Sequence, residues 1–423
     1  MIPQSRRLAL NALHLCLDQQ QDLQAAVDTA LSESAHAQDK NLATELAYGY
    51  TRFCGRLDAI LNTLLSKPGK TSPGLRRILG LAAYEILFLD GIPEYASLDW
   101  AVSLSRKRFG QAPAKVANGV LRSLTRLGNE AQSQDYLRKH LKDDRAFKTA
   151  WYACPAWIVQ LWEAAFGEET AAKLLAASLM TPPPAVRLNV QHPHSTELAE
   201  KLTPLALQSS TSGLAFRTWP AFLNEEILQG AATRQSLAAQ DIMHALSPTD
   251  WPEPIFDACA GRGGKTYLLA EMGKAVWASD VNMFRLRQLK NEGKRLGLPV
   301  PILRAPGQGP YPFRSPPQTI LLDAPCSGLG VLARRPDIKL KRTSGNCAQL
   351  AKLQRNMLLA TAATLPAGGN IAYVTCTLNP LENEQQIRGF LAEQPDFRYV
   401  IETQTPTDSN LGEFFYGALL VKK

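Results

Sequence analysis

The sequence lacks the features that would place it in a membrane, on a secretory route or around a metal. None of its apolar runs approaches the roughly eighteen residues that a membrane-spanning helix needs. Residues 6–17 faintly resemble a signal peptide, but polar residues interrupt the run and no small-residue cleavage site follows. The 7 cysteines are scattered, form no Cys-x-x-Cys pair and have no histidine at zinc spacing. We therefore expect a cytoplasmic protein with reduced thiols, no membrane segment and no metal.

Strong net charge is also missing. Lysine and arginine exceed aspartate and glutamate by 46 − 38 = 8 in 423 residues. An excess of this size suits an anionic partner such as RNA but is also common in soluble enzymes. The length predicts two or three domains, and a monomer is our default expectation.

Residues 1–130 lack any useful stretch of two-residue alternation and carry no catalytic constellation. Apolar residues recur there at helical spacing, as in the series Leu75, Ile78, Leu79, Ala82, Ile86 and Leu89. We predict an all-helical domain. Its basic residues suit either an RNA-facing surface or a solvated helix face.

The next two segments are predicted to lead into a catalytic domain. Residues 131–150 are polar, charged and poorly periodic, which indicates a linker or a frayed helix. Residues 151–235 predict a small α+β segment, with a helix over 157–179, a stop at the proline run 182–184 and a strand over 185–190.

From residue 236 onward the pattern is that of alternating strands and helices. A short buried strand at 255–258 is followed by a glycine-rich turn, a helix and a second strand that ends at Asp280. Asp280 lies 280 − 257 = 23 residues after Asp257, close to the separation of about 20 residues at which a second-strand acid binds ribose hydroxyls. The rhythm predicts an α/β domain over 236–423 with a Rossmann-like, doubly wound parallel sheet, a nucleoside cofactor and a final edge strand or strand pair over 414–421.

Two cysteines follow apolar, β-prone runs in this domain. Cys326 stands in Asp323-Ala324-Pro325-Cys326-Ser327-Gly328, and Cys376 stands in Thr375-Cys376-Thr377. Each is expected at the carboxyl end of a strand, where open α/β sheets hold their ligands. A thiol there can act as a thiolate nucleophile, although an isolated cysteine is more often a small buried apolar residue.

Motifs along nearly the whole chain resemble those of one family. Residues 39–52 and 116–122 resemble the helical NusB RNA-binding domain. The stretches 257–266, Asp280, 323–330, 334–338, Thr375-Cys376 and 382–384 resemble the RsmB/Sun (Fmu) family of S-adenosylmethionine-dependent RNA cytosine-5 methyltransferases.

The resemblance implies roles for particular residues. Cys376 would be the nucleophile that adds to C6 of cytosine, Cys326 would assist its release, and Asp323 would contact the cytosine. Residues of the glycine loop together with two acids would bind S-adenosylmethionine: Cys259, Ala260, Gly261, Arg262, Gly263, Gly264, Lys265, Asp280 and Asp323. The implied substrate is small-subunit (16S) ribosomal RNA, with tRNA as an alternative.

Two departures from the family pattern favour a different kind of protein. Arg262 replaces the usual proline of the cofactor loop, and Pro306 stands where the family usually has an acid for the adenine. Both would weaken cofactor binding and would suit a non-catalytic RNA-binding or assembly factor. The two retained cysteines favour the enzyme.

Overall fold

The computed structural model describes residues 2–32, 34 and 36–423, which fold into two compact units. Residues 1–180 and 335–342 form unit 1, and residues 181–334 and 343–423 form unit 2.

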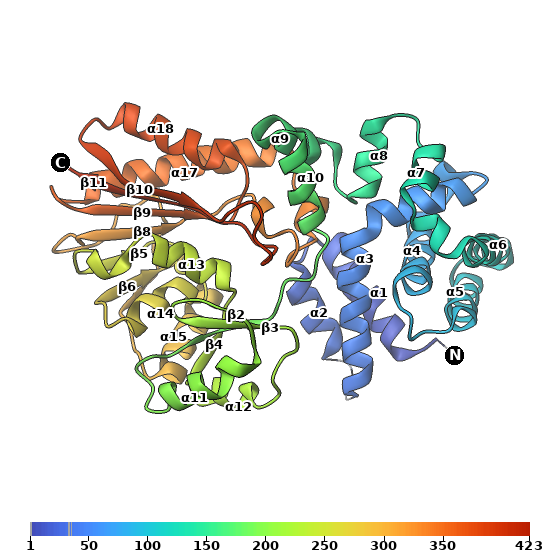
Figure 1. Cartoon of the computed structure of the whole chain (residues 1–423), viewed down its shortest axis with the longest axis horizontal. Coiled ribbons are helices and arrows are strands. Elements are labelled where there is room, and N and C mark those ends of the chain that lie inside the picture. The colour runs from blue at the N-terminus through green and yellow to red at the C-terminus, as the bar shows by residue number, and fades with distance from the viewer. Residues whose placement is uncertain (1, 33, 35) are drawn as a thin grey trace. The chain divides into compact units, whose positions relative to one another are not determined.

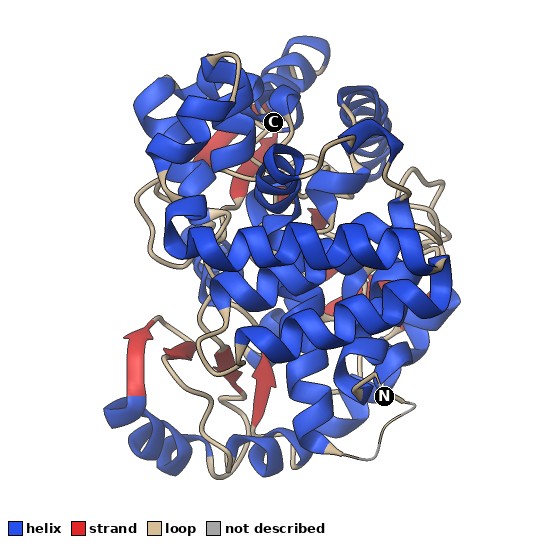
Figure 2. Ribbon diagram, turned by 90° about the vertical axis from the view of Figure 1, so that its right-hand side faces the viewer, coloured by secondary structure: helices blue, strands red, loops and turns tan. Residues whose placement is uncertain are grey.

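Unit 1 is helical, as the sequence predicts for its first 130 residues (Figures 1 and 2). Neighbouring helices such as α3, α4 and α5 pack in sequence order. Its helices are α1 (Gln4–Leu17), α2 (Leu23–Leu31), α3 (Ala37–Leu64), α4 (Pro73–Phe88), α5 (Glu94–Phe109), α6 (Gln111–Leu127), α7 (Gln134–His140), α8 (Asp144–Trp151), α9 (Ala156–Phe166), α10 (Glu168–Ala177) and α16 (Ile338–Lys341).

Residues 131–150, which we expected to be a linker, contain α7 and most of α8. Their apolar residues Tyr136, Leu137 and Phe147 are buried in the main core of unit 1. The helices at 156–177 also belong to unit 1, so the segment predicted over 151–235 divides between the two units. The helix predicted over 157–179 is present as α9 and α10, whereas α7 and α8 were not predicted because each is too short to show a clear apolar stripe.

A buried carboxylate ties three helices of unit 1 together. Glu85 on α4 is fully buried and accepts hydrogen bonds from Arg6 Nε (2.7 Å), Ser97 Oγ (2.6 Å) and Trp100 Nε1 (2.9 Å). These donors compensate the cost of burying a charge in the helical core.

Residues 335–342 belong to unit 1 although the chain on either side of them belongs to unit 2. Lys339 is 1% exposed, and its Nζ donates to the backbone carbonyl of Arg52 at 2.6 Å. Burial lowers the pKa of Lys339. Lys341 pairs with Asp337 at 2.8 Å. Part of the motif 334–338 is thus a structural element of the helical unit.

Unit 2 contains a seven-stranded sheet of the predicted kind. Its strand order is β10-β11-β9-β8-β5-β6-β7, and the five strands from β9 to β7 are parallel. The strands are β5 (Ile255–Asp257), β6 (Val276–Ser279), β7 (Ile302–Leu303), β8 (Thr319–Asp323), β9 (Asn370–Thr375), β10 (Phe397–Gln404) and β11 (Tyr416–Lys422). The tail at 414–421, predicted as an edge strand or a strand pair, holds one strand, β11, which lies between β9 and the edge strand β10.

Helices cover both faces of this sheet (Figure 1). One core packs α17 and α18 against the sheet through residues such as Leu358 and Phe390, and another packs α14 and α15 through Tyr267 and Leu289. The helices of unit 2 are α11 (Ser195–Leu202), α12 (Leu223–Leu228), α13 (Leu237–Ala245), α14 (Gly264–Glu271), α15 (Met283–Leu296), α17 (Ser344–Thr364) and α18 (Glu384–Glu393).

A second, four-stranded sheet precedes the large one, in the order β2-β3-β1-β4. Its strands are β1 (Ala185–Leu188), β2 (Ala206–Ser209), β3 (Gly213–Phe216) and β4 (Ala232–Arg234). The fully buried Arg187 of β1 donates to Glu271 at 2.5 and 3.0 Å and to the carbonyl of Gly264 at 2.7 Å. This ion pair links the small sheet to α14.

Candidate active site

The two predicted cysteines meet at the carboxyl ends of β8 and β9. These strands are parallel neighbours in which Asp323 pairs with Val374, so the turns that follow them emerge side by side. The Sγ atoms of Cys326 and Cys376 are 3.2 Å apart, and the Cys376 backbone N–H donates to Cys326 Sγ at 3.3 Å. Both thiols are half-buried. A small molecule placed over this edge of the sheet could contact both sulfurs.

A buried carboxylate holds the two cysteine turns together. Glu382 Oε2 accepts hydrogen bonds from the Ser327 backbone N–H (2.8 Å) and from Gln354 Nε2 (3.0 Å), while Oε1 accepts from Asn379 (2.8 Å). Gln354 also donates to the Pro325 carbonyl at 3.0 Å. Glu382 was known only as part of a motif, and its link to the Cys326 turn was not predicted. Its place in the motif 382–384 was the sequence signal that pointed to it.

Lys265 and Asp323 form an ion pair beside the thiols. Lys265 Nζ lies 2.7 Å from Asp323 Oδ2, and the Lys265 side chain is only 10% exposed. Burial lowers the pKa of Lys265, but Asp323, helped by Cys376, outweighs burial and raises it overall. Lys265 therefore carries a positive charge that acts on both Asp323 and Cys376.

The two thiols have different electrostatic surroundings. The Cys376 sulfur and burial together raise the pKa of Cys326 well above its ordinary value, so Cys326 stays a thiol and can donate a hydrogen bond. Lys265 places a positive charge near the Cys376 sulfur. The pair therefore combines a candidate nucleophile with a neighbouring proton donor.

The predicted glycine loop lies at the carboxyl ends of β5 and β6. Asp280 is 6% exposed and accepts hydrogen bonds from the backbone N–H groups of Gly261 (3.1 Å) and Asn282 (2.7 Å). Gly263 has φ +93°, and an added Cβ would lie 2.6 Å from the ring of Tyr267. Apart from Gly261 and its two chain neighbours, no described residue has an atom within 4 Å of the Cβ position of Gly261, so the backbone there is open to a ligand.

These residues fit a nucleoside cofactor. Asp280 offers a strand-end carboxylate for ribose hydroxyls, and the loop offers accessible backbone. The departure at Pro306 lies beside the same loop, because a Cβ on the adjacent Gly307 would be 3.2 Å from Cys259 Sγ. Arg262 is exposed. Burial, with the negative charge of Asp257, raises the pKa of Cys259 well above its ordinary value.

Arg187 lies in β1, within the strand that the sequence predicts over 185–190. Its bond to the Gly264 carbonyl attaches it to the first residue of α14. Arg187 therefore holds the helix end that follows the glycine loop. Its partner Glu271 was not singled out, because two charges 84 residues apart give no local signal.

Comparisons with known proteins agree with this geometry. Residues 243–418 match the family described as 16S rRNA methyltransferase RsmB/F, and residues 3–126 match the NusB family. The probable ribosomal RNA small subunit methyltransferase B of Synechocystis sp. is 33% identical over 389 residues, covering 88% of this chain and 85% of the relative. The chain belongs to the RsmB/F methyltransferase family.

Further relatives extend over the same length. The probable ribosomal RNA small subunit methyltransferase B of Bacillus subtilis is 31% identical, covering 93% of this chain and 89% of the relative. The crystal structure of PH0851 has the same fold, with a TM-score of 0.79, 21% identity and coverage of 100% of this chain and 99% of that one.

Membership of the RsmB/F family confirms the predicted activity. The chain is an RNA cytosine-C5 methyltransferase, and S-adenosylmethionine is its methyl donor. Within the part of the chain that the structure describes, no helix has the length and apolarity to cross a bilayer.

Proposed function

We propose that this RsmB/F methyltransferase modifies a cytosine of small-subunit ribosomal RNA through a covalent adduct on Cys376. The observation that carries the mechanism is the 3.2 Å approach of the two thiols next to the Lys265–Asp323 ion pair. The names of the relatives from Synechocystis and Bacillus support the choice of RNA.

The adduct answers a chemical need. C5 of cytosine is a poor nucleophile, so a thiolate must first add to C6 and convert C5 into an enamine-like carbon. S-adenosylmethionine, when bound, supplies the electrophilic methyl group. C5 takes this methyl group as the sulfonium S–CH3 bond breaks, with S-adenosylhomocysteine as the leaving group. A base then removes the C5 proton, and the C6–S bond breaks to release Cys376 as a thiolate.

Each group of the site suits one of these steps. Lys265 favours the attacking thiolate, and Asp323 is placed to contact the amino edge of the base. Cys326, held as a thiol at 3.2 Å, can donate a hydrogen bond to the departing Cys376 sulfur. Asp280 and the loop 259–265 would hold the cofactor.

Residues 1–130 are proposed to help bind the RNA. Arg106, Lys107 and Arg108 are exposed at the end of α5, and this region lies within the match to the NusB family. A monomeric state and a cytoplasmic location stay predictions.

A covalent-trapping experiment tests the division between the thiols. Cys326→Ala should methylate labelled small-subunit ribosomal RNA but stay attached to it, giving a slow-migrating band on a denaturing gel. Cys376→Ala and the double variant should give none. Cys347→Ala, which removes a buried thiol of α17, is the matched control and should behave like the wild type. A band from Cys376→Ala would make Cys326 the nucleophile.

The same assay separates the alternative functions. Trapping on tRNA alone would replace the ribosomal substrate. No trapping, together with no S-adenosylmethionine binding by calorimetry, would favour a non-catalytic RNA-binding factor.

A further inference from the structure

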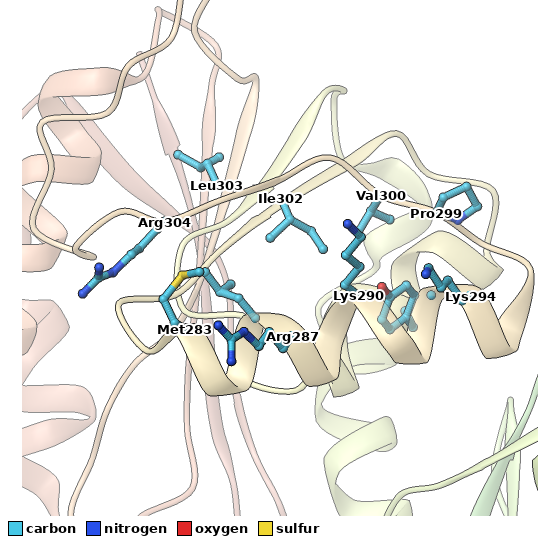
Figure 3. Close-up of a pocket in the computed structure, with 12 residues that line it drawn as sticks. Met283, Arg287, Lys290, Lys294, Pro299, Val300, Ile302, Leu303 and Arg304 are labelled. Carbon is cyan, nitrogen blue, oxygen red and sulfur yellow. The ribbon is translucent and has the colours of Figure 1, made fainter.

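A groove of about 560 Å³ lies between α15 and the edge strand β7, away from the two thiols. Figure 3 shows its two walls. Met283, Arg287, Lys290 and Lys294 follow the helix, and the chain from Pro299 to Arg304 runs opposite.

The groove combines an apolar floor with cations. Leu286 is buried, and Val300, Ile302 and Leu303 are half-buried beside it. Four of the twelve lining residues are cations, none is an acid, and the cations are exposed: Arg287, Lys290, Lys294 and Arg304.

Three of these cations have no acidic partner among the residues that the structure describes. Among the described residues, no ion pair involves Arg287, Lys290 or Lys294, whereas Arg285 and Arg295 on the same helix pair with Asp280 and Glu292. The three follow one helix face at spacings of three and four residues, where like charges repel and destabilise a helix. A face with this pattern is stabilised by an anion.

One end of the groove lies at the carboxyl edge of the sheet, the edge that carries the two cysteines. Arg304 follows β7 directly, and its Nε donates to the carbonyl of Val281, next to Asp280, at 3.0 Å. β7 is three strand positions from β8, which carries Asp323, so the separation is roughly 14 Å at about 4.8 Å per strand. A strand of RNA with its target base at Asp323 can therefore reach the groove within a few nucleotides.

We propose that this groove, defined by Arg287, Lys290, Lys294 and the floor of β7, binds single-stranded RNA next to the target cytosine. This inference rests on the proposed function. The cations match the charge of successive phosphates, and the apolar floor suits the faces of unstacked bases, which a duplex would keep covered.

The test compares two triple variants of the full chain that each remove three positive charges. The groove variant is Arg287→Ala, Lys290→Ala and Lys294→Ala. The control variant is Lys352→Ala, Arg388→Ala and Arg398→Ala, whose exposed cations lie on α17, α18 and the opposite edge strand β10.

RNA affinity is measured against salt concentration, with a transcribed fragment of small-subunit ribosomal RNA that contains the methylated site. Each phosphate contact to a single strand contributes about 0.7 to the slope of log affinity against log salt, so loss of three should lower the slope by about 2. At low salt we expect a loss of roughly tenfold or more in affinity for the groove variant and a much smaller loss for the control. In the wild-type protein, ultraviolet cross-linking should attach the RNA to residues 283–304.

Equal slopes and affinities for the two triple variants would overturn the inference. Loss of S-adenosylmethionine binding would reveal misfolding of the groove variant. The double variant Lys290→Gln and Lys294→Gln would then replace it, and the slope of log affinity against log salt should fall by about 1.4. If polyglutamate binding, and not RNA binding, depended on the groove, the occupant would be an acidic protein and the inference would fail. If the wild type methylated no RNA, the proposed function would fail first.

Discussion

Gly330 offers a sharp test of how backbone packing positions the nucleophile. It lies in the short turn after Cys326, where its N–H donates to the Cys376 carbonyl at 3.0 Å and its carbonyl accepts from the Phe414 N–H at 2.8 Å. In Gly330→Ala the new Cβ would lie 2.1 Å from the Phe414 carbonyl oxygen and 2.9 Å from that of Cys376. Both clashing atoms belong to the backbone, so no side-chain rotation can relieve them.

The size of the effect follows from these distances. Opening the 2.1 Å contact to an ordinary separation requires a shift of about 1 Å in the chain around Cys376 or Phe414. Overpacking of this kind costs about 1–3 kcal/mol of folding free energy. Misplacing a reacting group by about 1 Å lowers turnover by about 10²-fold. We expect Gly330→Ala to lose that much kcat/KM, while its affinity for S-adenosylmethionine stays near that of the wild type.

The assay is transfer of a labelled methyl group to small-subunit ribosomal RNA, with calorimetry for the cofactor and urea denaturation for stability. Gly345→Ala is the matched control, because the nearest atom to its added Cβ is Thr343 Oγ1 at 3.8 Å. Wild-type turnover and stability in Gly330→Ala would refute the claim that this turn positions Cys376.

Three other predictions follow from buried charges. Burial raises the pKa of Asp257 to about 7, so the folded state keeps a proton that the unfolded chain releases above about pH 4. The stability that this proton provides is full below pH 4 and is lost as the pH rises through 7. In Asp257→Asn, the unfolding free energy from urea titrations should decline less over this pH range. An unchanged decline would contradict the raised pKa of Asp257. Arg187→Met should cost about 3–5 kcal/mol because it leaves Glu271 buried and unpaired, and Glu271→Leu added to it should restore most of the loss. A single variant as stable as the wild type would exclude a structural role for the pair. Asp280→Ala should weaken S-adenosylmethionine binding by about 1–3 kcal/mol in calorimetry, and an unchanged Kd would mean that other groups hold the ribose.

Local patterns in the sequence were sufficient to predict whether each large region is helical or α/β. Apolar spacing of three and four residues predicted the helices of residues 6–126, and strands that alternate with helices predicted the parallel sheet of unit 2. The acid at Asp280 and the strand-end cysteines were found for the same reason, since parallel strands deliver their carboxyl ends to one edge. The helices within residues 131–150 were not predicted because α7 and α8 have 7 and 8 residues, too few for a clear apolar period.

Only the tertiary structure decided which distant side chains meet. The 3.2 Å distance between the two thiols depends on the register of β8 against β9, and the Lys265–Asp323 pair joins residues 58 positions apart. The sequence determined that β11 is a strand but not that it lies inside the sheet. Its apolar run would look the same at the edge of the sheet or between two other strands. Likewise, residues 335–342 fold with unit 1, where Lys339 is buried and donates to the backbone carbonyl of Arg52. Local periodicity fixes the kind of element, whereas partners across long stretches of chain are chosen by packing and by the need to satisfy buried charges.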